Sequence, residues 1–276
     1  MPGSRRANSG GGQAVDILLN GHTNAKARPL LNALFDAAAS LGYDVLMGDH
    51  GDMRKGAWRV VYGLGGADRT QYVGYPGLIA FDLAYWDRKG DNRKFRVSIG
   101  GGYHCPGRIM LGGDPGPQRW NQAGLNVRNG GNPKGPVLLV GNGPKSNAVG
   151  ASGWAARKSE ELKKLGHTVW YRPKPGRSQE PGVRFDAIAD GLIDDVLGRV
   201  SLVVCRHSNV AVDACRLGVP VVCDDGAAAA IYPSRLEDWQ QQPDEAIRRE
   251  FLHRLAWWQW APTEAMQFWQ WIKGRM

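Results

Sequence analysis

The most informative polar residues follow the apolar run Val200–Cys205, where Arg206, His207, Ser208 and Asn209 lead directly into a helix-like segment. Ser208 or Asn209 can cap this helix, whose free backbone N–H groups and dipole attract negative charge. Arg206 and His207 add side-chain donors at the same point. The pattern predicts a site that holds a phosphate or diphosphate without a metal ion, and an ordinary capped helix is the alternative.

A second polar loop, Gly141-Asn-Gly-Pro-Lys-Ser146, follows the strand-like run Pro136–Val140. It offers backbone amides around Gly143, together with Lys145 and Ser146, to another anionic group. Its spacing fits neither a nucleotide-triphosphatase loop nor the glycine pattern of a dinucleotide-binding loop. A plain tight turn is the alternative interpretation.

A third loop, Tyr171-Arg-Pro-Lys-Pro175, sets Arg172 and Lys174 between prolines that stiffen the backbone. Rigid cations suit a phosphate, although a solvated polyproline-like connector has the same composition. All three loops leave the carboxyl ends of predicted strands, which is where ligands bind in open α/β sheets. We therefore expect the loops to converge on one anionic ligand.

The elements around these loops alternate between apolar strands and helix-period segments. In the second half, strands are predicted at 136–140, 167–171, 200–205 and 219–223, and helices at 153–165, 188–197 and 208–217. Apolar strands that alternate with helices indicate a parallel sheet covered on both faces.

The first half has a similar α/β pattern. Strands are predicted at 15–20, 44–47, 58–63, 78–83 and 95–99, and a helix at 25–41. Residues 100–135 are rich in Gly, Pro and Asn without a regular period, so the boundary is placed there. The expected organisation is a disordered lead-in at 1–13, an acceptor-side domain at 14–134 and a donor-binding domain at 135–245. Two Rossmann-like parallel-sheet domains of this kind are expected to face a cleft.

The tail, residues 246–276, is helix-like, and Pro262 predicts a break into two helices. It holds five of the eleven tryptophans, namely Trp257, Trp258, Trp260, Trp269 and Trp271. Exposed tryptophan on this scale is a liability. The tail is therefore expected to pack against the domains, and a base-stacking platform is the alternative.

The composition, 42% hydrophobic and 22% charged over 276 residues, is that of a folded protein. No run approaches the roughly 18 to 20 apolar residues of a membrane span. The basic, Gly/Ser-rich start lacks the apolar segment of a signal peptide, so a cytoplasmic location is expected, in the host cytoplasm if the protein is phage-encoded. Four cysteines without a CxxC pair, and no HxH or HExxH motif, give no reason to expect disulfides or a metal. Asp224-Asp225 at the end of a strand leaves a cation-assisted mechanism as the alternative, although adjacent residues point in different directions. The sequence indicates no oligomeric state.

The net charge of +9 is concentrated in the first half, where residues 1–134 hold 17 Lys and Arg against 10 Asp and Glu. This excess favours an anionic partner. The stretch 80–87 contains aromatic residues and is followed by five cations, a mixture that is typical of nucleic-acid-binding surfaces. The cations are Arg88, Lys89, Arg93, Lys94 and Arg96. A solvated edge is the alternative for this basic run.

Four residues in the first half are candidate general bases. Asp82 ends a predicted strand, where a carboxylate can take the proton of an acceptor hydroxyl, although capping of the next turn would also explain it. His22 and His50 follow two other predicted strands, and His104 lies in the loop Gly102-Tyr-His-Cys105. A single histidine in a loop is more often a hydrogen-bonding residue than a catalyst, so these three are alternatives to Asp82.

The second half resembles the nucleotide-sugar-binding domain of two-domain, GT-B-type glycosyltransferases in the order Ser208-Asn209, Asp213-Ala214 and Gly218-Val-Pro-Val221. The loop Arg172-Pro-Lys-Pro175 resembles the Arg-Pro-His-Pro loop of sugar- and glycerophosphate-transfer enzymes, with Lys in place of His. Together with the closing Leu255-Ala-x-x-Gln-Trp260, these motifs also resemble phage-encoded glycosyltransferase-like proteins associated with DNA base modification. The likeness covers roughly residues 136–262.

The resemblance implies a hexosyltransferase-like, metal-independent enzyme that moves a sugar from a nucleotide sugar, UDP-glucose or another UDP-sugar, to a hydroxyl. The implied acceptor is a 5-hydroxymethylpyrimidine in DNA, flipped out of the helix. The implied donor-binding residues are Gly143, Lys145, Ser146, Arg172, Lys174, Arg206, His207, Ser208, Asn209 and Asp213. The alternatives are a sugar or glycerophosphate transferase acting on a cell-surface polymer, and a non-catalytic nucleic-acid-binding protein with the same fold.

Overall fold

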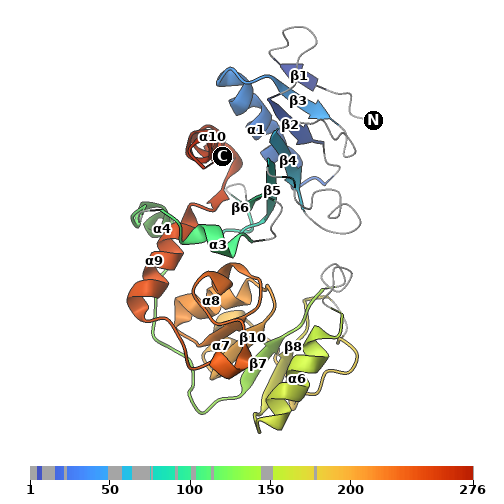
Figure 1. Cartoon of the computed structure of the whole chain (residues 1–276), viewed down its shortest axis with the longest axis vertical. Helices are drawn as coiled ribbons and strands as arrows, with labels where there is room; N and C mark the ends of the chain where they lie inside the picture. The colour runs from blue at the N-terminus through green and yellow to red at the C-terminus, as the bar shows by residue number, and fades with distance from the viewer. Residues whose placement is uncertain are drawn as a thin grey trace. The chain divides into compact units, whose positions relative to one another are not determined.

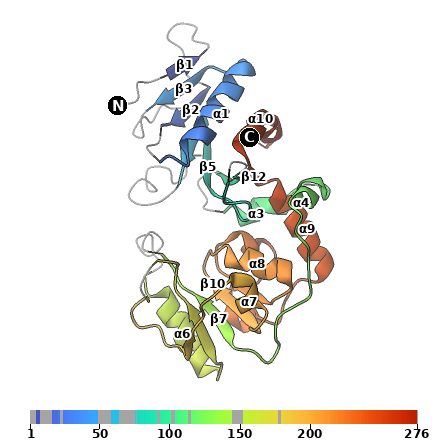
Figure 2. The same cartoon turned by 180° about the vertical axis from the view of Figure 1, so that it is seen from behind.

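The structure, a computed structural model, describes residues 5–7, 16–21, 24–48, 58–63, 75, 77–90, 93–100, 104–112, 115–143, 152–176 and 179–275. The chain divides into two compact units (Figures 1 and 2). The first unit comprises Met1–Tyr103 and Trp257–Met276, and the second comprises His104–Ala256. Each unit is built on one sheet flanked by helices.

The second unit holds a five-stranded sheet in the order β11-β10-β7-β8-β9, and every neighbouring pair is parallel. The strands are β7 (Val137–Val140), β8 (Val169–Arg172), β9 (Ala187–Ile188), β10 (Leu202–Cys205) and β11 (Val221–Cys223). Four of them lie where the apolar runs predicted strands. The short β9 stands where a helix was expected to begin.

Helices α6 (Trp154–Lys164) and α8 (Val210–Leu217) lie against the strands of this parallel sheet. The unit also contains α3 (Pro106–Ile109), α4 (Gln118–Gln122), α7 (Ile193–Leu197) and α9 (Glu245–Ala256), with 3-10 turns η2 (Ala227–Ala230) and η3 (Leu236–Asp238). Leu139 and Val204 pack in one cluster with Leu162 of α6 and Leu236 of η3. Successive strand residues point to opposite faces, and their neighbour Val203 is buried as well. Both faces of the sheet are therefore covered, as predicted.

The first unit holds a seven-stranded sheet in the order β1-β3-β2-β4-β5-β6-β12. Its strands are β1 (Arg5–Ala7), β2 (Ile17–Asn20), β3 (Val45–Gly48), β4 (Trp58–Tyr62), β5 (Leu78–Leu83), β6 (Phe95–Ile99) and β12 (Gln259–Trp260). Strands β3, β2, β4 and β5 are parallel, whereas β1, β6 and β12 add antiparallel pairs at the two ends. Helices α1 (Arg28–Ser40) and α10 (Ala265–Lys273) pack against each other.

Two parts of this unit differ from the sequence-based expectation. Residues 5–7, expected in a disordered lead-in, form β1, because they pair with β3 and Arg6 Nη2 lies 2.7 Å from the carboxylate of Asp44. The tail breaks as expected, with the 3-10 turn η4 (Pro262–Glu264) between α9 and α10, but a strand also forms in the break.

The tryptophans of the tail form part of the core. Trp260, Trp269, Trp258 and Trp271 are each less than a tenth exposed. Trp269 Nε1 donates to the carbonyl oxygen of Leu34 at 2.9 Å. The packing prediction is confirmed, and a base-stacking platform made of these four indoles is excluded because their faces are buried.

The break between the units, after Tyr103, lies within residues 100–135, where the boundary was placed, but before the domain limits of 134 and 135. Residues 104–134 belong to the second unit, where Arg128 N donates to the carbonyl oxygen of Arg216 at 2.8 Å. Arg248 of α9 in turn donates to the carbonyl oxygen of Arg128 at 3.1 Å. None of the described helices has the length and apolar character that a membrane span requires.

Candidate functional site

The loops after β7, β8, β10 and β11 lie at one edge of the second unit's sheet, as predicted for parallel strands. Cys205 and Cys223 are paired in register, and Arg206 and Asp224 come directly after them. Asp225 N donates to the carbonyl oxygen of Arg206 at 2.9 Å, which extends the pairing beyond the strands. The polar residues after β10 and β11 are thereby fixed side by side.

Arg206 and Asp225 form an ion pair, with Nε 3.3 Å from Oδ2. This contact leaves Arg206 Nη1 and Asp225 Oδ1 buried without a hydrogen-bond partner, and Asp224 Oδ1 is in the same state. A buried polar atom that makes no hydrogen bond costs about 1 to 3 kcal/mol. Such atoms at a strand edge are positions that a polar ligand would satisfy.

The loop after β7 has the same character. Asn142 is 8% exposed, its backbone N–H donates to buried Glu180, and its side-chain Nδ2 has no partner. A Cβ on Gly143 would lie 2.8 Å from Cδ and 3.0 Å from Nζ of Lys174, so the Lys174 side chain lies against this glycine. The predicted convergence of the loops after β7 and β8 is therefore present at Gly143 and Lys174.

Glu180 is held from a second side by Tyr171, whose hydroxyl donates to Glu180 Oε1 at 3.3 Å. Burial is the main cause that raises the pKa of Tyr171 to about 12. The phenol therefore stays protonated at neutral pH and can keep this bond. The contact fixes the position of the loop that contains Asn142.

The start of α8 offers backbone donors, as the sequence suggested. Ser208 Oγ accepts a hydrogen bond from Val210 N at 3.2 Å, whereas Asn209 makes no side-chain cap. A Cβ on Gly226 would lie 3.0 Å from Cα of His207, so the loops after β10 and β11 touch at this glycine. Asp213 lies in the first turn of α8 and is partly exposed.

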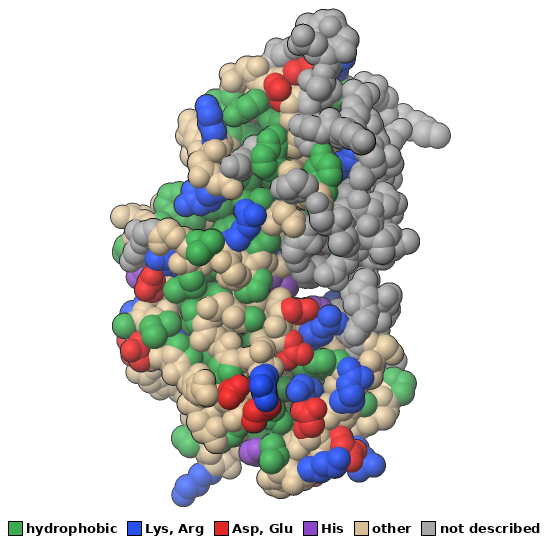
Figure 3. All heavy atoms as spheres, in the orientation of Figure 1, with side chains coloured by type: hydrophobic (Ala, Val, Ile, Leu, Met, Phe, Trp, Pro, Cys, Tyr) green, Lys and Arg blue, Asp and Glu red, His purple; other side chains and the backbone are tan. Residues whose placement is uncertain are grey.

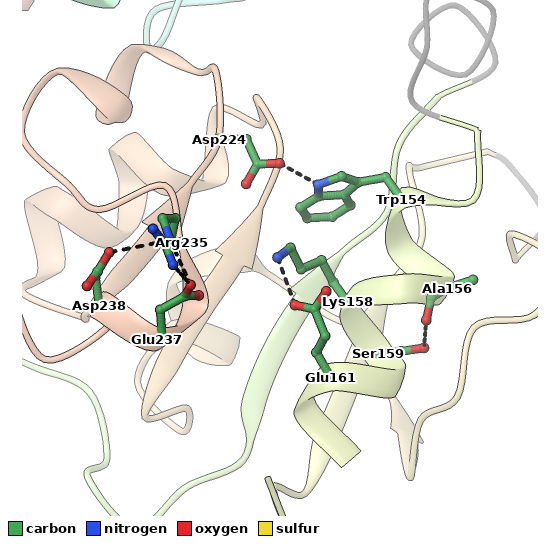
Figure 4. A network of polar contacts seen from close by, with 9 residues as sticks. All are labelled: Trp154, Ala156, Lys158, Ser159, Glu161, Asp224, Arg235, Glu237 and Asp238. Atoms are coloured by element: carbon green, nitrogen blue, oxygen red, sulfur yellow. Dashed lines mark hydrogen bonds and ion pairs between the residues drawn. The ribbon is translucent and has the colours of Figure 1, made fainter. Parts of the chain in front are cut away.

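Asp224 is held by a residue of α6. Trp154 Nε1 donates to Asp224 Oδ2, and Figure 4 shows the indole and the carboxylate pointing toward each other. Burial raises the pKa of Asp224, and repulsion from Asp225 adds to this effect, whereas the Trp154 hydrogen bond, Lys158 and Arg206 oppose it. The site thus keeps a carboxylate where its charged form is disfavoured.

Asp224→Asn is expected to raise the melting temperature at pH 7. Because the pKa of Asp224 is higher in the folded chain than in the unfolded one, the charged group costs stability at high pH. This cost is fully present above the folded-state pKa and vanishes below the unfolded value of about 3.8. An amide oxygen can still accept from Trp154, so the gain should shrink as the pH falls toward that value.

Asp186→Asn is the matched control for this prediction. The side-chain hydrogen bond from Lys163 lowers the pKa of Asp186, so its charged form contributes stability above the unfolded pKa and loses it as the pH falls. This variant should therefore melt below the wild type at pH 7. A melting temperature of Asp224→Asn that is unchanged or lower at pH 7 would contradict the account.

Arg172 is placed differently from the other donor candidates. Its Nη1 and Nη2 donate to the carbonyl oxygens of Ala189 and Gly191, each at 2.9 Å. The guanidinium thus holds the turn after β9, a strand that the sequence did not predict. The ring of His207 lies 6.2 Å from that of His104, which is 3% exposed.

Some predicted site residues lie outside the described part of the chain. They are Lys145, Ser146, His22 and His50. Within the described ranges, no three His, Cys, Asp or Glu side chains are grouped so that they could hold a metal ion.

The candidate base lies in the first unit. Asp82 pairs across β5 and β6 with Arg96, at 3.0 Å between Oδ2 and Nη2, and Arg96 is 5% exposed. Lys94 lies 3.3 Å from the carboxylate of Asp87. Arg96 and Lys94, two of the five predicted nucleic-acid-binding cations, therefore each have an acidic partner in the sheet or in its turn.

The other three cations of this run occupy the same turn. Arg88 donates to the carbonyl oxygen of Tyr85, and Arg93 Nε donates to that of Arg88 at 3.1 Å. Lys89 is exposed. On the face drawn in Figure 3, Lys and Arg side chains in the lower half, which is the second unit, are interspersed with Asp and Glu.

Several residues of the site were not recognised as ligand-binding from the sequence. Asn142 looked like part of a turn, and Trp154 looked like the start of a helix. Asp224 and Asp225 follow a buried strand, which marked them only as a possible cation site. Their position after β11, beside β10, was the available signal for a place in this site.

Comparisons with known proteins agree with this architecture. No family model matches the chain, and no curated protein matches it in sequence. Among solved structures, two chains from Thermosulfurimonas dismutans are similar, KpsC beta Kdo 2,7 transferase and KpsC beta Kdo 2,4 transferase. Both are 14% identical, with TM-scores of 0.57 and 0.50. The first comparison covers 91% of this chain and 97% of the other, and the second covers 90% and 92%.

A third similar structure, the spinosyn rhamnosyltransferase SpnG complexed with thymidine diphosphate, is 14% identical over 92% of this chain and 73% of its own, with a TM-score of only 0.29. The first two likenesses extend over both units and nearly the whole of each chain. With its two α/β units and its helical, tryptophan-rich tail, the chain has a GT-B-like fold.

Proposed function

We propose that the chain is a glycosyltransferase that binds the diphosphate of a nucleotide-sugar donor at the strand ends of the second unit. The observation that carries the proposal is that two buried donors lack partners, Arg206 Nη1 in the loop before α8 and Asn142 Nδ2 in the loop after β7. Lys174 and the amide groups around Gly143 add positive potential at the same edge. The likeness to two Kdo transferases supports sugar transfer as the reaction class.

In the proposed reaction the bond between the anomeric carbon and the diphosphate oxygen breaks, and a bond from the acceptor oxygen forms. The proton of the acceptor hydroxyl passes to a base, and the bonding electrons stay on the diphosphate. Arg206, Lys174 and the α8 amides stabilise that developing charge, as preorganised donors do in other enzymes. We propose that these groups take the place of a metal ion. Asp82, His22 and His50 are the proposed bases.

For the substrates, we propose a UDP-sugar as donor and an anionic molecule with a free hydroxyl as acceptor. The net charge of +9 supports an anionic acceptor. DNA that carries a 5-hydroxymethylpyrimidine, and an anionic cell-surface polymer, both meet this description. Within the described basic run, Lys89 and Arg88 are exposed, and because Arg88 is held by the carbonyl oxygen of Tyr85, Lys89 is the residue we propose for contact with such an acceptor.

The test is thermal stabilisation of the full chain by UDP, GDP, CDP, ADP and TDP and by their sugars. A ligand that binds only the folded state at 100 times its Kd stabilises by about 2.7 kcal/mol, which is a measurable rise in melting temperature. We expect a rise with one nucleotide and sugar release from the matching donor when an acceptor is added. A rise with DNA but with no nucleotide would contradict the proposal and favour a nucleic-acid-binding protein.

A further inference from the structure

The end of the proposed donor site that lies after β11 differs in chemistry from the rest. The loops after β7, β8 and β10 present hydrogen-bond donors and cations, among them Asn142, Lys174 and Arg206. The loop after β11, at the edge of the sheet, presents the carboxylates of Asp224 and Asp225. A ligand that spans this edge therefore meets donors at one part and acceptors at the other.

Asp224 and Asp225 are held in the same way. Oδ2 of Asp224 accepts a hydrogen bond from Trp154 Nε1. Oδ2 of Asp225 lies 3.3 Å from Arg206 Nε. In each, Oδ1 is buried and has no hydrogen-bond partner. Two consecutive carboxylates thus keep one fixed oxygen apiece for a ligand.

An independent observation points to a ligand at this edge. Asn142, in the loop after β7, the strand next to β10, is more than nine-tenths buried and has an Nδ2 group without a partner. A carboxylate oxygen can only accept hydrogen bonds, and an amide nitrogen can only donate them. The complete ligand must therefore combine acceptor oxygens, such as those of a phosphate, with hydroxyl or amine donors.

We propose that Asp224 and Asp225 select a donor whose transferred sugar is neutral and rich in hydroxyls, and reject an acidic sugar. This inference rests on the proposed function. Hydroxyl groups of a neutral sugar donate to the two Oδ1 atoms, whereas a sugar carboxylate would face two like charges, which weakens binding strongly. Trp154 is a positioning residue, because its indole N–H fixes the Asp224 carboxylate.

Two unpaired carboxylate oxygens are also a chemistry that suits a divalent cation. Positive charge is, however, already supplied beside each carboxylate. Arg206 pairs with Asp225, and Lys158 lies near enough to Asp224 to lower its pKa against the effect of burial. We therefore expect sugar binding without a metal ion, and the experiment includes this comparison.

The experiment is calorimetric titration of the full chain with UDP, UDP-glucose and UDP-glucuronate in EDTA, and with GDP, GDP-mannose and GDP-mannuronate in parallel. UDP-glucose and UDP-glucuronate differ only in the oxidation state of the sugar carbon C6, and so do GDP-mannose and GDP-mannuronate. We expect the neutral sugar nucleotide to bind about tenfold or more tightly than the acidic one. Asp224→Asn should bring the two affinities within about threefold, chiefly by improving the acidic sugar, while the free nucleoside diphosphate binds as before.

Asp194→Asn is the matched control, because Asp194 pairs with Arg216 on α7 and α8 and should leave the discrimination intact. Equal binding of neutral and acidic sugars by a chain that binds the nucleoside diphosphate would overturn the inference alone. Binding of the sugar part that is lost in EDTA and restored by Mg²⁺ would overturn it too, since the carboxylates would then hold a cation. If no nucleoside diphosphate binds, the proposed function fails and the inference falls with it.

Discussion

Arg206→Gln is expected to weaken binding of the nucleoside diphosphate about 10- to 100-fold. Arg206 supplies a buried Nη1 without a partner at the strand end, and its Nε is held by Asp225. A hydrogen bond to a charged group contributes about 1.5 to 3 kcal/mol, and each 1.4 kcal/mol corresponds to about tenfold in affinity. Glutamine keeps much of the length of the side chain but loses the charge and the fork of donors.

Arg216→Gln is the matched control for this loss. Arg216 also pairs with an aspartate, Asp194, at 2.7 Å, and it belongs to the same unit as Arg206 but lies in the last turn of α8. Both variants remove one ion pair, so their effects on stability should be similar, whereas only Arg206→Gln should change nucleotide affinity. Calorimetric titration of both with the nucleotide found by thermal stabilisation gives the comparison. Equal affinities in the two variants would remove Arg206 from the site.

Gly218→Ala is expected to lower the free energy of unfolding by about 3 kcal/mol. Gly218 ends α8 with φ at +73°, a backbone conformation that costs an L-residue roughly 1 to 2 kcal/mol. A Cβ there would also lie 2.5 Å from the carbonyl oxygen of Arg128 and 2.9 Å from Cα of Asn129. These are backbone atoms, and forcing them apart adds about 1 to 3 kcal/mol.

Gly166→Ala separates the two causes. Gly166 follows α6 with a similar φ of +78°, but a Cβ there would meet nothing within 4 Å. This control should therefore lose only the strain contribution, so that Gly218→Ala unfolds at clearly lower denaturant concentration. If the two variants unfold at the same concentration, the close approach of 128–130 to Gly218 is not a real constraint.

The close approach at Gly218 also shows why the sequence alone could not assign residues 104–134 to the second unit. Residues 104–134 have no regular hydrophobic period, so their composition predicted a linker. Their position in the second unit depends on contacts with residues far along the chain, such as those that Arg248 makes with Arg128 and Asn129. A local pattern carries no information about such partners.

The strands of the two sheets were predictable because buried strands must be apolar throughout or alternate regularly. Strands β9 and β12, two residues each, carry no such pattern and exist because a neighbouring strand offers its backbone. This has a consequence for the site. Arg172 was expected to bind phosphate, but β9 and its turn give the guanidinium two carbonyl oxygens.

The position of the candidate site followed from the sequence better than its composition did. Loops after parallel strands meet at one edge, so Lys174 and the loop of Gly143 were expected together, and they are. The contact between Trp154 and Asp224 joins residues 70 positions apart and depends on how α6 packs over the sheet. Only the structure could place that indole beside that carboxylate.

The most direct test of the central claim is backbone hydrogen exchange of the full chain, with and without the nucleoside diphosphate that stabilises it. Exchange slows where a ligand orders or covers an amide group. The account predicts slower exchange at 141–143, 206–210 and 224–226, the segments that follow β7, β10 and β11. Slower exchange confined to the first unit, for example at 78–99, would contradict a donor site at the strand ends of the second.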